Sequence, residues 1–249
     1  MSLLLSPFEL FLVLSGPFVG SWLATLAVSW PQWPEASLLR SACGRCAHPL
    51  PAWRMIPLVS FAIQRGRCAY CRAPISPVHP ALEAACLFGA SIAVLATDGG
   101  QAAGGAMLSW LLAYAAAVDE RALEIPDWSS LALAMAGLVL AAGQGLPALA
   151  QAFAGALIVG AVLGGVHLLW RRLAGREGLG AGDVKLAAAC AVWTGPVLAA
   201  PAIALAGLAT LARIAVQPEL RRPGARIAFG PGLGAGFFAI WAANAAYGP

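Results

Sequence analysis

Long apolar runs separated by short polar segments make up most of the chain. A helix needs about 20 mostly apolar residues to cross a bilayer, and several runs approach that length. We therefore predict about eight transmembrane helices, at residues 8–28, 80–97, 102–118, 128–143, 148–170, 184–199, 200–216 and 228–247. Gly195, Pro196 and Pro201 interrupt the apolar stretch 184–216, which indicates two spans joined by a tight turn.

The composition agrees with an all-α integral membrane protein. Hydrophobic residues form 60% of the chain and charged residues 10%, whereas soluble domains average about 45–50% and about 25%. The first apolar run lacks a basic segment before it and a small-residue cleavage site after it. We therefore expect a retained span rather than a signal peptide.

The basic residues predict how the spans are oriented. The 15 Lys and Arg residues lie within 30–79, at Arg121, within 171–185 and within 213–226. With eight spans and the N-terminus outside, all of them fall on the cytoplasmic side, which is the positive-inside distribution. Topology thus accounts for the net charge of +4, and we expect no nucleic-acid partner.

A polar insert at residues 30–79 separates the first two predicted spans. It contains two C-x2-C pairs, whose members are Cys43, Cys46, Cys68 and Cys71. Two such pairs bring four thiolates within reach of one tetrahedral Zn²⁺, and four cysteine ligands leave no open position for water. We predict a structural zinc site. Disulfides are the alternative, but the predicted cytoplasmic location is reducing. The apolar stretch 56–63 is expected to give this insert a small buried core.

Two aspartates lie at predicted span ends on the cytoplasmic side. Asp183 follows GLGAG and precedes an apolar run, a position that also suits a helix N-cap. Asp119 follows the span 102–118, where the helix dipole makes a carboxylate unfavourable, so a functional reason is expected. Two carboxylates in a partly dry pocket share a proton, and such a pair can activate water and protonate a peptide group, as in aspartic proteases. Asp119 and Asp183 are the candidate catalytic pair.

Four further residues are candidates for supporting this pocket: Gly180, Gly182, Lys185 and Glu83. The glycines permit close backbone approach. Lys185 lies two residues after the second aspartate, and Glu83 lies one turn into the second span. Asp127 is expected to cap the fourth span, and Glu120 and Glu124 are expected to be solvated loop acids.

A transporter or channel is the competing class of protein. In that case the two aspartates form an ion or proton relay, and the zinc insert is a regulatory domain. Such a protein needs acids near the middle of the bilayer and polar faces along several spans. The acids here gather at one predicted membrane edge, and the spans are rich in Ala, Leu and Gly. This distribution favours the protease.

The motifs, taken in order, resemble those of the prepilin leader peptidases of bacterial type IV pilus and type II secretion systems. Those enzymes are Gly-x-Gly-Asp intramembrane aspartic proteases. The resemblance runs along most of the chain. It is carried by GSWL at 20–23, the two cysteine pairs with IPLVS between them, HPALE at 79–83, DERALEIPD at 119–127, GAGDVKL at 180–186 and AFGPGLGAG at 228–236.

The resemblance implies a function for several residues. It makes Asp119 and Asp183 the catalytic pair and the four cysteines the zinc ligands. It implies cleavage of the leader of prepilins or pseudopilins after a glycine, at the cytoplasmic face of the bacterial inner membrane. It also implies methylation of the new N-terminus with S-adenosylmethionine. The sequence leaves the oligomeric state and the S-adenosylmethionine-binding residues open.

The expected organisation has three parts. A first transmembrane helix occupies residues 1–29, the zinc-binding insert occupies 30–79 and has a possible part in methyl transfer, and the polytopic peptidase domain occupies 80–249.

Overall fold

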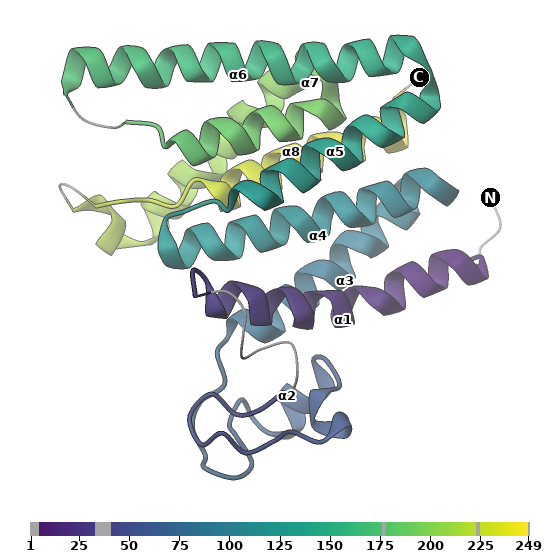
Figure 1. The fold of residues 1–249 in the computed structure, drawn as a ribbon, viewed down its shortest axis with the longest axis vertical. Coiled ribbons are helices and arrows are strands. Elements are labelled where there is room, and N and C mark those ends of the chain that lie inside the picture. Colours follow the sequence, from purple (N-terminus) through teal and green to yellow (C-terminus); the bar gives the residue numbers. More distant parts are fainter. Residues whose placement is uncertain (1–4, 33–40, 176–177, 223–224, 249) are drawn as a thin grey trace.

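The computed structural model describes residues 5–32, 41–175, 178–222 and 225–248. Seven long helices form a bundle in which they lie side by side (Figure 1): α1 Pro7–Ser29, α3 Val78–Ala96, α4 Gly99–Ala122, α5 Asp127–Gln144, α6 Leu146–Ala174, α7 Ala181–Val216 and α8 Gly230–Tyr247. The shorter elements are η1 Ala52–Met55, α2 Val59–Ile63 and η2 Pro218–Arg221. The prediction of an all-α fold is confirmed.

Five of the described helices, α1, α3, α4, α6 and α7, are long and apolar enough to cross a membrane. Their outer faces expose large apolar side chains: Phe11 on α1 is 65% exposed, Leu95 on α3 80% and Leu173 on α6 77%. Exposed apolar surface of this extent is typical of contact with lipid rather than with water. The fold is that of a multi-pass membrane protein.

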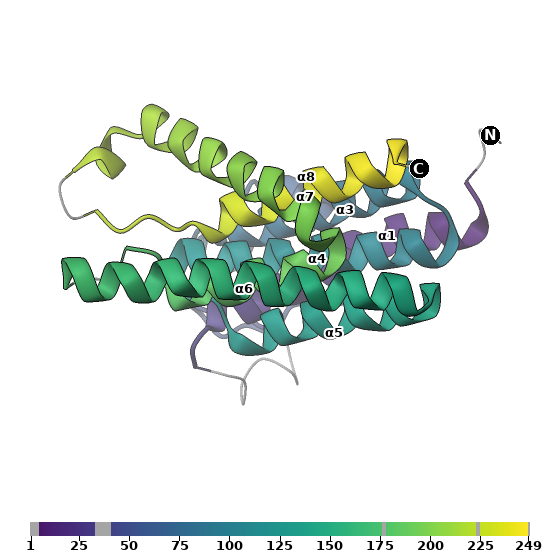
Figure 2. The ribbon, with the colours of Figure 1, turned by 90° about the horizontal axis from the view of Figure 1, so that it is seen from above.

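The predicted interruption of 184–216 is present, at Gly195, one of the three residues that indicated it. Helix α7 changes direction at Gly195, where φ is 70° and ψ is 176°. Glycine adopts a positive φ at little cost, and the following Pro196 has no N–H to continue the helical hydrogen bonds. The first of the two predicted spans therefore ends at Gly195 rather than at residue 199. Figure 2 shows the second part of α7 diverging from α6 on the side of α8.

Small residues let the helices pack closely. Helix α1 packs on α3, α3 on α4, α4 on α8, and α7 on both α6 and α8. At Gly20 of α1, an added Cβ would lie 2.5 Å from the carbonyl oxygen of Leu82 in α3. Only a glycine allows the two backbones to approach this closely, as is common between membrane helices.

The insert between α1 and α3 projects from the bundle beside α1 (Figure 1). Its apolar stretch forms the predicted buried core only in part, since Pro57 is buried and Leu58 and Phe61 are half-buried. Ile56 is 44% exposed and Val59 50%, and Ile63 in the short helix α2 is 73% exposed. A stretch of so few residues cannot bury all of its side chains against itself.

Candidate active site

A cavity of about 540 Å³ opens at the end of the bundle where α4 ends and where α5 and α7 begin. Both candidate aspartates line it, although they are 64 positions apart in the sequence (183 − 119 = 64). Four carboxylates, one ammonium group and two indole rings contribute to its wall: Asp119, Glu124, Asp127, Asp183, Lys185, Trp30 and Trp128. The fold thus brings the two predicted catalytic side chains to one hollow.

Asp119 lies in the last turn of α4 and is 5% exposed. The backbone N–H of Gly230, at the start of α8, donates a hydrogen bond of 2.7 Å to its Oδ2. The C-terminal end of α4 disfavours a carboxylate, but the N-terminal end of α8 favours one. This contact explains how an acid is accommodated at the end of α4.

Asp183 lies in the first turn of α7 and is half-buried. The N-cap position belongs to Gly180, so Asp183 is the third residue of the helix rather than its cap. An added Cβ at Gly180 would lie 2.9 Å from Oδ2 of Asp183, and one at Gly182 would lie 3.3 Å from Cβ of Ile125. Gly180 therefore leaves room for the carboxylate of Asp183, and Gly182 leaves room for the segment that follows α4.

The segment that joins α4 to α5 lies between the two aspartates. Leu123 ends α4 with a left-handed backbone, at φ 54°. Asp127 is the first residue of α5 and forms an ion pair with Lys185 of α7, while Pro126 occupies the cap position, so the cap prediction for Asp127 is wrong. The indole N–H of Trp30, at the end of α1, donates a hydrogen bond of 3.1 Å to Glu124.

A second ion pair lies next to Asp119. Both terminal nitrogens of Arg213, near the end of α7, donate to the two carboxylate oxygens of Glu120. Glu120 is exposed, as predicted, but it lies in α4 rather than in a loop and is paired. No signal in the sequence connects these two residues, because they are 93 positions apart.

Glu83 does not line this cavity among the residues that the structure describes. It is 5% exposed in α3 and accepts a hydrogen bond of 2.7 Å from the backbone N–H of Leu58. Leu58 has a φ of 61° and precedes α2. Glu83 thus ties the insert to the helix bundle.

The four cysteines of the insert lie together. Their Sγ atoms are all within 4.8 Å of one another, and those of Cys43 and Cys71 are 3.8 Å apart. Two thiolates bound to one tetrahedral zinc at about 2.3 Å are about 3.8 Å apart, so the donor set and its spacing fit Zn²⁺. All four cysteines are free thiols rather than disulfides.

The backbone around the cysteines also suits a metal. Hydrogen bonds from the backbone N–H groups of Cys46 and Arg45 lower the pKa of the Cys43 thiol to about 6. Backbone N–H groups of Cys71 and Tyr70 lower the pKa of Cys68 in the same way. Thiolates are the form of cysteine that binds metals. The first cysteine of each C-x2-C turn therefore has the same local structure, which stabilises the form that binds a metal.

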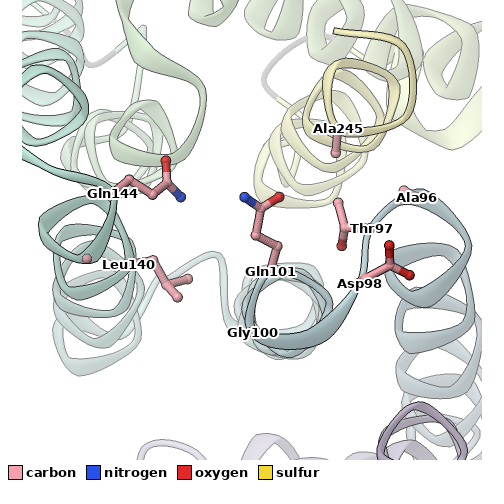
Figure 3. Close-up of a pocket in the computed structure, with 9 residues that line it drawn as sticks. Ala96, Thr97, Asp98, Gly100, Gln101, Leu140, Gln144 and Ala245 are labelled. Atoms are coloured by element: carbon pink, nitrogen blue, oxygen red, sulfur yellow. The ribbon is translucent and has the colours of Figure 1, made fainter. Parts of the chain in front are cut away.

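A second cavity, of about 620 Å³, lies at the opposite ends of the same helices, where α3 and α5 end and α4 begins. Figure 3 shows the side chains of Gln101 and Gln144 extending toward each other across it, with Asp98 at one side. Asp98 is the only carboxylate among the described residues that line this cavity. It does not provide a carboxylate pair.

Comparison with known proteins identifies the class of protein that carries this fold and site. Residues 14–97 match the family model of the Bacterial Peptidase A24 N-terminal domain, and residues 106–215 match that of the Type IV leader peptidase family. Both candidate aspartates lie in the second match and the four cysteines in the first.

Three similar proteins are each named prepilin leader peptidase/N-methyltransferase. The one from Klebsiella pneumoniae is 36% identical over 194 residues, 74% of this chain and 84% of the relative. The one from Burkholderia pseudomallei (strain K96243) is 35% identical over 206 residues, 79% and 65% of the two chains. The one from Aeromonas hydrophila is 35% identical over 157 residues, 63% and 54%.

The chain belongs to the type IV leader peptidase family. It spans 54% of the Aeromonas hydrophila relative and 65% of the Burkholderia pseudomallei relative. No solved structure matches the chain significantly.

Proposed function

We propose that the protein is an intramembrane aspartic endopeptidase in which Asp119 and Asp183 are the catalytic pair. The observation that carries this proposal is that the two carboxylates, one from the end of α4 and one from the start of α7, line a single cavity. One carboxylate activates a water molecule while the other protonates the scissile carbonyl. The matches of residues 14–97 and 106–215 to the two peptidase family models support this chemistry.

The substrates that we propose are type IV prepilins or type II secretion pseudopilins. The names of the relatives support this class, since each is a prepilin leader peptidase. Cleavage would follow a glycine, where a short leader meets an apolar helix. A cavity at the helix ends suits such a site, because the cleaved bond then lies at the membrane edge and within reach of water.

The proposed setting is the bacterial inner membrane, with eight crossings and the cavity on the cytoplasmic side. In this arrangement each long helix crosses the membrane once, except α7, whose two parts each cross once. The distribution of Arg and Lys supports this orientation. The proposed organisation keeps α1 within 1–29, the zinc-binding insert within 30–79 and the peptidase domain within 80–249.

The proposed second activity is methylation of the new N-terminus with S-adenosylmethionine, which the names of the relatives support. In the insert, Cys43, Cys46, Cys68 and Cys71 would hold one Zn²⁺. The ion would act as a cross-link that folds the insert, because four thiolates leave it no position for a reactant.

Leader cleavage tests the peptidase proposal. Wild type, Asp119→Asn and Asp183→Asn are purified and reconstituted in lipid with a prepilin. Zinc content reports folding of the insert, and helical content reports folding of the bundle. We expect both variants to keep zinc and to lose cleavage by at least about 10³-fold, since the two groups act as one unit. Asp98→Asn, at the opposite end of the bundle, is the control and should cleave as wild type. Cleavage near the wild-type rate by Asp183→Asn would refute the pair.

A further inference from the structure

We propose that the backbone N–H of Gly230 holds Asp119 as the carboxylate that activates water, which leaves Asp183 as the proton donor. This inference rests on the proposed peptidase function and gives each aspartate a separate role. It also gives a role to the AFGPG segment, residues 228–232, which the pair of aspartates by itself does not explain.

The first argument is the hydrogen bond itself. The N–H of Gly230 donates to Oδ2 of Asp119 at 2.7 Å in a buried location. Hydrogen bonds to ionised acceptors are shorter and roughly twice as strong as those to neutral ones. The first N–H groups of a helix have no acceptor within the helix, and together they carry a partial positive charge. The start of α8 therefore stabilises Asp119 most strongly in its ionised form.

The second argument is that position 230 leaves room only for a glycine. An added Cβ would lie 2.8 Å from Oδ2 and 3.0 Å from Cβ of Asp119. Pro231 follows at the second position of the helix and has no N–H to offer the carboxylate. The N–H of Gly230 is thus presented to Asp119 without a side chain in between.

The third argument is the charge balance around the cavity. Two carboxylates in one cavity do not both ionise easily, so one of them keeps a proton. The start of α7 also favours an anion at Asp183, and the backbone N–H of Gly180 interacts with that carboxylate. Both contributions come from the start of the residue's own helix, whereas Asp119 accepts a buried hydrogen bond of 2.7 Å from a second helix. The other charged groups near the pair are Glu120 and Arg213, which neutralise each other, and Glu124, Asp127 and Lys185 at the cavity wall.

These roles give a balanced reaction. Ionised Asp119 takes a proton from water as the water oxygen bonds to the peptide carbon, and Asp183 gives its proton to the carbonyl oxygen. The resulting diol then breaks its C–N bond. Asp119 gives its proton to the leaving nitrogen, and Asp183 takes one from a hydroxyl group. The products are a carboxylic acid and an amine, and both aspartates return to their starting states.

The test compares two alanine substitutions on the same helix. Gly230→Ala inserts a methyl group against Asp119, while Gly234→Ala meets only an ordinary contact, 3.6 Å from Cβ of Leu112. We expect Gly230→Ala to lower kcat about 10- to 100-fold. This is the fall in rate that corresponds to the loss of one hydrogen bond to a charged group. KM should stay unchanged, and the acidic limb of the pH–rate profile should move to higher pH. Gly234→Ala should behave as wild type.

An amide-to-ester substitution at position 230, made by nonsense suppression with the hydroxy acid, removes the N–H and adds no side chain. This N–H has no acceptor within α8, but the ester also makes the carbonyl of Phe229 a weaker acceptor for the N–H of Leu233, a bond of 3.0 Å, so thermal unfolding is measured beside the rate. The ester should reproduce the fall in kcat and the displaced acidic limb. If wild type cleaves and the ester variant keeps both the rate and the pH profile, the role of Gly230 is refuted. If wild type itself does not cleave, the proposed function fails instead.

Discussion

The carboxylate of Asp119 lies at the C-terminal end of α4 and at the N-terminal end of α8. The first location disfavours its charge and the second favours it, so its neighbours in space reverse what its own helix dictates. Asp127 shows a related effect. It follows Pro126, which occupies the cap position of α5, and its carboxylate pairs with Lys185 of α7 rather than capping its own helix.

At the residue scale, the ion pair of Asp127 with Lys185 allows a test of how the cavity wall is held. Asp127→Asn and Lys185→Met should each lower kcat/KM only about two- to fivefold, because exposed ion pairs contribute about 0–1 kcal/mol. The exchanged double variant Asp127→Lys with Lys185→Asp should recover most of the loss. A loss as large as that of Asp183→Asn would mean that Lys185 takes part in the reaction itself.

The helices position the side chains of the cavity, and glycines set the distances between the helices. The contact of Gly20 with α3 holds α1 against the bundle, and the end of α1 places Trp30 at the cavity. Helix α7 positions two different side chains at this end of the bundle because it changes direction at Gly195. Its first part carries Asp183, and its second part carries Arg213 back to the same end of the bundle.

At the element scale, Gly20→Ala should destabilise the packing of α1 on α3. The new methyl group would meet backbone atoms that cannot move aside, and such overpacking costs about 1–3 kcal/mol. Thermal unfolding in detergent should therefore show a lower midpoint. Gly207→Ala in α7 is the control, because an added Cβ there meets nothing within 4 Å. Equal midpoints for the two variants would contradict the close approach.

The whole molecule consists of a helix bundle and an insert that meet at few points. Glu83 is the best defined of these, because its carboxylate accepts the N–H of Leu58 from a buried position. In the described part of the insert, Ile56, Val59 and Ile63 are exposed, so little apolar surface is buried there. A metal held by the four cysteines would therefore contribute much of its stability.

At the scale of the whole molecule, loss of zinc should unfold the insert and spare the bundle. We expect one zinc per chain in wild type and a loss of most of it in Cys68→Ser. The arginines of the insert should then become open to trypsin, while the helical content stays nearly constant. Cys86→Ser changes a buried cysteine of α3 outside the cluster and should keep its zinc. Intact zinc binding in Cys68→Ser would overturn the four-cysteine site.

Much of this protein was predictable from its sequence because the relevant signals are local. Apolar runs are as long as the helices that they form, and the break in α7 was expected from a glycine and two prolines within one run. The four cysteines were identifiable because each C-x2-C pair closes its turn within a few residues. Both candidate aspartates were identifiable because each lies at the end of an apolar run in a chain with few charges.

The tertiary structure alone decided what surrounds those residues. The N–H of Gly230 meets Asp119 across 111 positions, Arg213 meets Glu120 across 93, and Lys185 meets Asp127 across 58. The same holds for the exposure of the insert's apolar stretch and for the place of Glu83 outside the cavity. Hydrophobic periodicity and turn chemistry act within a few residues, whereas these partners are chosen by the packing of whole helices, which no single segment encodes.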